Sequence, residues 1–203
     1  MEYNDIKELA LSYADREDAE VTEKVDSFLR IVEARMNRFL RVRKMSSRAV
    51  LVTDEDQEYY GLPSDFNGLR DVVLRDTLDS KTRTTMQYLN PEQMNSITAD
   101  HTGAYYAIIG NQLQIRPAQE NKILEITYFQ RIVELDSINT SNWMSEDYPD
   151  AYVFGLMVEI SSFTKDAEAA VMWEQRFNAA MVAIETTDIK NRWSGTSLRM
   201  ING

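Results

Sequence analysis

The hydrophobic pattern is densest between residues 150 and 163, where a helix-length segment carries apolar side chains on every face. Glu159 is the only charge between the ends of this segment. A helix without a polar face must be enclosed by other elements or by other subunits. The segment is too short to cross a bilayer, so the enclosing material is expected to be protein. Pro149 and Asp150 suit the first turn of this central helix.

The residues that follow predict an amphipathic helix packed against the central one. Thr164, Lys165 and Asp166 offer capping side chains at its start. One apolar stripe then recurs at helical spacing, on Ala170, Trp173, Phe177, Ala180, Met181 and Ile184. Residues 150–189 are therefore predicted to form an antiparallel helical hairpin, with a single continuous helix as the alternative.

Two further helices are predicted at the N-terminus. The first begins after Asn4 and carries its apolar stripe on Ile6, Leu9, Ala10 and Tyr13. The second is expected to run to about Arg43, with a stripe on Val21, Val25, Phe28, Leu29, Val32, Met36, Phe39 and Leu40. Together the four helices predict a four-helix bundle. Its expected core contains Phe28, Val32, Phe154, Leu156, Trp173 and Phe177.

Between residues 48 and 131 the hydrophobic period falls towards two, which is typical of strands. The candidate strands are residues 49–53, 69–75, 82–89, 105–109, 112–116 and 123–130. A two-residue turn at Gly110 and Asn111 would place Ile108 opposite Leu113 and Tyr106 opposite Ile115. A helical turn initiated by Pro91 is expected to interrupt the strands.

The predicted fold class is therefore α+β, a four-helix bundle with an inserted antiparallel β subdomain and an extended C-terminal arm. The N-terminal helices occupy residues 1–47, the β subdomain 48–132, the C-terminal hairpin 133–190 and the arm 191–203. The arm has no helical stripe, yet it holds Trp193, Leu198, Met200 and Ile201. Such a segment is either a frayed end or an arm that orders against another protein.

Cations gather along the second helix and just beyond it. From residue 30 to residue 48, Glu33 is the only acid, against Arg30, Arg35, Arg38, Arg41, Arg43, Lys44 and Arg48. One interpretation is a solvated helix end whose cations favour the helix dipole. The other is an interface with an acidic neighbouring chain.

The composition narrows the classes of function. The chain has 203 residues, a formal net charge of -11 and no cysteine, so disulfides and cysteine metal sites are excluded. A strongly acidic protein is not expected to bind nucleic acid generally, because it lacks the cations that neutralise phosphates. No signal peptide or membrane-spanning stretch is evident, which predicts a soluble product made in the cytoplasm.

No convergent catalytic motif stands out. His101, the only histidine, falls in a turn, where a surface role is favoured over a catalytic relay. Asp54, Glu55 and Asp56 are close enough to hold Mg²⁺, but they are typical of an exposed turn. Neither a cofactor nor a metal is therefore expected, and an enzyme is not predicted.

Several local signals resemble one family. They are Tyr60-Gly61-Leu62-Pro63-Ser64-Asp65-Phe66, Asn90-Pro91-Glu92-Gln93, residues 108–117, Ser141-Asn142-Trp143, Tyr148-Pro149-Asp150-Ala151-Tyr152, Trp193-Ser194-Gly195 and Leu198-Arg199-Met200. In this order and spacing, spanning nearly the whole chain, they resemble head-to-tail adaptor proteins of tailed bacteriophages.

The resemblance implies a virion structural protein of the neck, assembled in the host cytoplasm. Such adaptors form a ring, commonly twelvefold, that binds beneath the portal protein, extends the DNA channel without binding the DNA specifically, and carries the tail or nozzle protein. On this basis the expected portal-binding residues are Arg192, Trp193, Leu198, Arg199, Met200 and Ile201. The expected subunit-interface residues are Arg35, Arg38, Arg41, Arg43 and Lys44. A monomeric sugar- or peptide-binding domain built on the tyrosine-rich β part, and a carboxylate-based hydrolase, are the alternatives.

Overall fold

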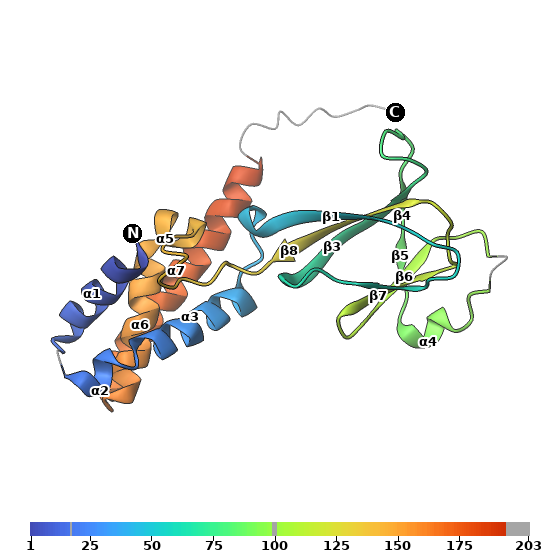
Figure 1. The fold of residues 1–203 in the computed structure, drawn as a ribbon. Helices are drawn as coiled ribbons and strands as arrows, with labels where there is room; N and C mark the ends of the chain where they lie inside the picture. The colour runs from blue at the N-terminus through green and yellow to red at the C-terminus, as the bar shows by residue number, and fades with distance from the viewer. Residues whose placement is uncertain (17, 99–100, 194–203) are drawn as a thin grey trace. The chain divides into compact units, whose positions relative to one another are not determined.

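The computed structural model describes residues 1–16, 18–98 and 101–193, and the chain divides into two compact units (Figure 1). The helical unit comprises Met1–Lys44 and Ile132–Gly203, and the β unit comprises Met45–Arg131. The β unit is thus an insertion, in sequence, between the two halves of the helical unit. The predicted α+β class is confirmed.

The helical unit is arranged around α6. Its helices are α1 (Tyr3–Ala14), α2 (Ala19–Thr22), α3 (Val25–Phe39), α5 (Trp143–Asp147), α6 (Pro149–Phe163) and α7 (Ala167–Trp193). Three of them, α1, α3 and α7, pack against α6. A regular four-helix bundle is not confirmed, because two short helices, α2 and α5, belong to the same unit.

The central helix is enclosed by the chain itself. Its buried residues are Ala151, Tyr152, Val153, Gly155, Leu156, Met157, Val158, Ile160 and Ser161. At Gly155 a side chain would not fit, because an added Cβ would lie 2.5 Å from Cγ1 of Val32 on α3. The absence of that Cβ lets the two helices approach closely. No neighbouring subunit is needed to cover α6.

The hairpin of α6 and α7 is confirmed, and the continuous-helix alternative is wrong. Lys165 takes a left-handed conformation with φ of 62° between the two helices. The Asp166 carboxylate accepts a hydrogen bond from the backbone N–H of Ala169 at 3.0 Å, which caps α7. On α7, Phe177, Met181 and Ile184 are buried as predicted.

Some details of the helical prediction are wrong. The first helix begins at Tyr3 with Glu2 as its N-cap, so Asn4 lies inside it rather than before it. Phe154 and Trp173 are only half-buried, since they pack on each other near the surface with ring centroids 5.8 Å apart. The second predicted helix is split, because Asp18 caps the short helix α2 and α3 begins only at Val25. It also ends at Phe39 rather than near Arg43, because an extended backbone after Phe39 buries the alternate residues Leu40 and Val42.

The β unit contains two four-stranded sheets. One has the order β1 (Ser46–Val52), β8 (Ile123–Gln130), β3 (Phe66–Arg75), β4 (Thr84–Thr85). The other has the order β2 (Tyr59–Gly61), β7 (Gln112–Arg116), β6 (Tyr105–Ile109), β5 (Gln87–Tyr88). The short helix α4 (Pro91–Met94) begins at the predicted Pro91, with Asn90 as its cap.

The predicted hairpin of β6 and β7 is confirmed in its register. Ile108 lies opposite Leu113, and Tyr106 lies opposite Ile115. Gly110 has a φ of 59° in the turn, a conformation that glycine adopts without strain. The expectation of a purely antiparallel subdomain is wrong at one place, because β5 pairs with β6 in parallel.

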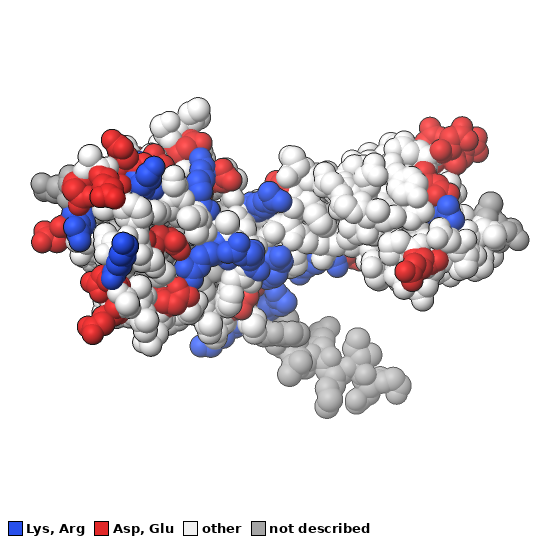
Figure 2. Space-filling model, turned by 90° about the horizontal axis from the view of Figure 1, so that it is seen from below, with Lys and Arg blue, Asp and Glu red and all other residues white. Residues whose placement is uncertain are grey.

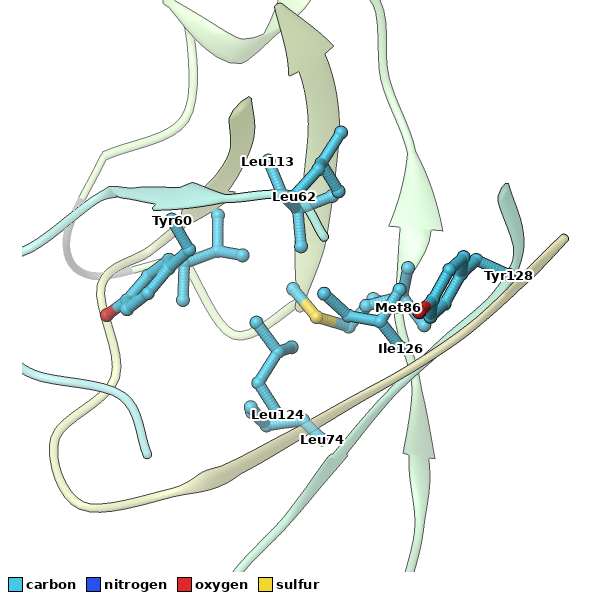
Figure 3. Packing of buried hydrophobic residues seen from close by; sticks show 10 residues of the cluster. Tyr60, Leu62, Leu74, Met86, Leu113, Leu124, Ile126 and Tyr128 are labelled. Carbon is cyan, nitrogen blue, oxygen red and sulfur yellow. The ribbon is translucent and has the colours of Figure 1, made fainter. Parts of the chain in front are cut away.

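Alternate side chains of both sheets share one hydrophobic core (Figure 3). Its buried members are Tyr60, Leu62, Val72, Leu74, Met86, Leu113, Ile115, Leu124, Ile126 and Tyr128. The alternation of Leu113 and Ile115, and of Leu124, Ile126 and Tyr128, follows the two-residue period of strands. The β unit therefore has a core of its own.

Replacing Phe177 by Ala is expected to lower the free energy of unfolding by roughly 3 to 5 kcal/mol, because this ring is buried between α7 and the rest of the helical unit. Val171→Ala on the exposed side of the same helix is the control and should change it by no more than about 0.5 kcal/mol. Chemical denaturation measures both. A loss below about 1 kcal/mol for Phe177→Ala would show that the α7 stripe is not core.

Candidate functional site

The predicted basic interface lies at the C-terminal end of α3 and in the segment after it. Acidic partners for three of its five residues come from this chain. Arg35 binds the carboxylates of Glu159 at 3.2 Å and Glu174 at 2.6 Å, and its guanidinium lies 4.7 Å from the ring centroid of Phe177. Arg35 therefore links α3 to both α6 and α7.

Arg43 and Lys44 are paired in the same way. The Nε of Arg43 donates to Asp188 of α7 at 2.9 Å, and Lys44 pairs with Asp147 of α5. Burial opposes ionisation of Asp188, but hydrogen bonds from Arg43 and Arg192 hold the pKa of that carboxyl below its usual range. These contacts attach the segment after α3 to the C-terminal helices.

Arg38 and Arg41 differ from the other three. Both side chains are exposed. Arg41 donates from Nη1 to the carbonyl oxygens of Asn37 at 2.8 Å and Leu40 at 2.6 Å. Arg38 has no acidic partner within the described part of the chain. Arg38 is therefore an exposed cation that no acid of the described residues neutralises.

The predicted portal-binding residues lie at and beyond the end of α7. Arg192 is in the helix and pairs with Asp188 at 3.2 Å, so the first three residues assigned to the arm, 191–193, belong to α7 instead. Trp193 is the last residue of α7. Leu198, Arg199, Met200 and Ile201 lie outside the described residues.

A hollow of about 280 Å³ lies beside Arg43 and Lys44 of the predicted subunit interface. Its lining residues are Val42, Arg43, Lys44, Trp143, Tyr148, Ile184, Asp188 and Asn191. The Trp143 and Tyr148 rings meet edge to face at 6.3 Å, and Nζ of Lys44 lies 5.8 Å from the Trp143 ring centroid. The hollow lies where α7 approaches its end, between apolar walls and a paired charged rim.

Other candidate chemistry is scattered over the described residues. His101 is exposed, with its ring 6.1 Å from that of Tyr105. Asp54 and Asp56 lie in an exposed turn, where the Asp54 carboxylate accepts from the backbone of Asp56. Within the described ranges no three His, Asp or Glu residues are placed to hold a metal ion. None of the helices described there is long and apolar enough to cross a membrane.

The helical unit also contains a buried polar network that the sequence pattern did not indicate. Glu33 is only 2% exposed, and its Oε1 accepts from the backbone N–H of Leu135 at 2.7 Å and from the Tyr152 hydroxyl at 3.3 Å. Asn142 Nδ2 donates to the same hydroxyl at 2.8 Å. The network joins α3, the segment entering α5, and α6. The sequence signal that could have indicated this network is that Glu33 and Tyr152 each fall at a buried helix position.

Burial raises the pKa of Glu33 to about 7, although the hydrogen bond from Leu135 and the charge of Arg30 both act to lower it. The Oε2 atom is buried without a hydrogen-bond partner in the described structure, and the nearest cation is Arg30 at 3.6 Å. Burial also raises the pKa of Tyr152, so its hydroxyl stays protonated and donates to Glu33. The ionised form of Glu33 is therefore disfavoured in the folded protein.

These observations define an α+β protein with a helical unit and an inserted β unit. A family model described as SU10 adaptor protein matches residues 1–200. The chain belongs to that family, whose members are structural rather than catalytic. The resemblance to head-to-tail adaptors of tailed bacteriophages is confirmed. No curated protein matches the chain.

The free energy of unfolding is expected to fall as the pH rises from about 4.5 to about 7, because the unfolded chain releases the Glu33 proton first. The loss attributable to this carboxyl is on the order of 3 kcal/mol and is complete above the folded-state pKa. Denaturant titrations at several pH values measure it. Glu33→Gln, whose amide oxygen can still accept from Leu135, should lack this part of the slope. Parallel stability profiles for the two proteins would contradict the assignment.

Proposed function

We propose that this protein is a head-to-tail adaptor that assembles as a ring beneath the portal protein of a tailed phage. The ring, twelvefold by analogy with similar adaptors, extends the DNA channel and provides the attachment platform for the tail or nozzle protein. The observation that carries the proposal is the family match over residues 1–200. The accessible cations at the end of α3 and the apolar C-terminal segment support it as surfaces for partners.

The proposed portal contact is the C-terminal segment, with Arg192, Trp193, Leu198, Arg199, Met200 and Ile201 as its binding residues. In a partner groove each large apolar side chain contributes on the order of 1.5 to 3 kcal/mol, before the ordering cost of the arm. A ring carries one arm on each subunit. Once the first arm has bound, the others bind at high effective concentration, so the overall affinity for the portal exceeds that of a single arm.

The proposed subunit contacts involve Arg35, Arg38, Arg41, Arg43 and Lys44, but their contributions differ. Arg35, Arg43 and Lys44 already satisfy acids of their own chain. Their part is to hold the helices that present the surface. Arg38 and Arg41 are exposed, and charges at such a rim mainly set association rate and salt sensitivity.

Replacing Leu198, Met200 and Ile201 together by Ser is expected to weaken or abolish attachment to DNA-filled heads that lack the adaptor, while circular dichroism stays unchanged. Thr196→Ala with Ser197→Ala in the same segment is the matched control and should attach normally. Co-sedimentation with the heads measures attachment. Normal attachment of the triple variant would show that the portal anchor lies elsewhere, and attachment by neither the control nor the unmodified protein would refute the adaptor function.

Duplex DNA is expected not to bind detectably at physiological salt, because a protein with a net charge of -11 lacks the cations that displace counterions from phosphates. A channel that passes DNA must not retain it. A gel-shift assay at low and physiological salt measures the binding. Tight, salt-dependent retention of the duplex would be incompatible with a passive channel.

A further inference from the structure

The two ends of helix α3 carry opposite charge. The α1–α2 corner that precedes α3 exposes five acids, Glu8, Asp15, Asp18, Glu20 and Glu23, against the two cations Arg16 and Lys24. The other end exposes Arg38, Arg41, Arg43 and Lys44. On the face in Figure 2, acidic and basic side chains both lie on the surface of the helical unit. Because α3 has 15 residues, its two ends are roughly 22 Å apart.

The basic end has a hollow of about 280 Å³ between α3 and α7. It is lined by Arg35, Arg38, Phe39, Phe177, Asn178 and Met181. The Arg35 charge is already balanced by Glu159 and Glu174, so Arg38 supplies the uncompensated cation. Phe39 is 46% exposed beside it. The surface combines one available cation with accessible apolar area.

The acidic end has a hollow of about 400 Å³ between α1 and α2. It is lined by Glu8, Leu11, Ser12, Asp15, Arg16 and Thr22. Arg16 faces Asp18 at 3.7 Å. Among the described residues, neither Glu8 nor Asp15 forms an ion pair with a cation. This surface combines two available carboxylates with the half-buried Leu11.

We propose that these two hollows are the two halves of one contact between copies of this chain, with Arg38 of one copy entering the hollow of Glu8 and Asp15 of the next. Phe39 then covers Leu11, which removes two apolar surfaces from water. This inference rests on the proposed ring and names the segments that join its subunits. Arg38 and the carboxylates have complementary charge, whereas each end facing its own copy is repelled.

The contact is head-to-tail, because it joins opposite ends of α3 in successive copies. Such a heterologous contact leaves one free half at each end of an open chain, so further copies can add, and a ring forms where the rotation closes. A contact of each surface with itself would stop at a dimer. The contact is therefore of the kind that the proposed ring requires.

The absence of cysteine makes the contact directly testable. Ser12→Cys lies in the acidic hollow and Asn178→Cys lies in the basic one, and both positions are exposed. The double variant, incubated with DNA-filled heads lacking the adaptor and treated with a short bismaleimide, is expected to give a ladder of multimers. Each single variant alone should give none, because like surfaces do not meet. A control pair of Ser12→Cys with Ile138→Cys, a position outside both hollows, should also give none.

A charge exchange then tests the pairing itself. In the double-cysteine background, Arg38→Glu should lower multimer yield about tenfold, and adding Glu8→Arg with Asp15→Arg should restore it to within about twofold. Attachment to heads without a ladder from the double variant would overturn the inference while leaving the adaptor function intact. Dimers from a single variant, or a ladder insensitive to Arg38→Glu, would overturn it as well. Failure to attach to the heads at all would refute the proposed function and the inference with it.

Discussion

The enclosure of α6 is the constraint on which the rest of the helical unit depends. This helix has no polar face, so α1, α3 and α7 must all cover it. Two of these covering helices precede the β unit in sequence and one follows α6, so the two halves of the chain must meet. Gly155 permits a close approach of α3 to α6, because a Cβ at that position would collide with Val32. The insertion of the β unit is tolerated since that unit has its own core.

Charge is distributed around this apolar centre in two ways. Arg35 sits over Phe177 and binds acids of α6 and α7, and Arg43 binds Asp188 of α7. These ion pairs hold the C-terminal end of α3 to the helices that follow the β unit. Arg38, one turn along α3 from Arg35, has no such partner among the described residues. The same basic segment therefore both stabilises the subunit and leaves a cation for another molecule.

Much of the architecture was predictable because it depends on local periodicity. The enclosed helix, the hairpin with α7 and the register of Ile108 with Leu113 follow from patterns that span only a few residues. The three-residue strand β2 was missed because it is too short to show a period. The early end of α3 was missed because no breaker follows Phe39, and burial of Leu40 and Val42 decides the backbone there.

The candidate surfaces were less predictable, because ion pairs join residues far apart in sequence. In the sequence, Glu33 is the only acid among the cations of residues 30–48. In the structure, acids far away in the sequence form ion pairs with these cations: Glu159 and Glu174 with Arg35, and Asp188 with Arg43. Glu33 itself is buried and bound to Leu135, more than a hundred residues away. The two complementary hollows likewise combine side chains from different helices.

The central claim is that copies of this chain assemble on a portal as a closed ring. Native mass spectrometry of the purified portal after incubation with the full-length protein tests it most directly. The account predicts one dominant complex, in which the portal carries a single complete set of adaptor subunits, twelve for a twelvefold ring. A portal that stays bare beside free monomer, or that carries a broad range of copy numbers with no preferred value, would contradict it.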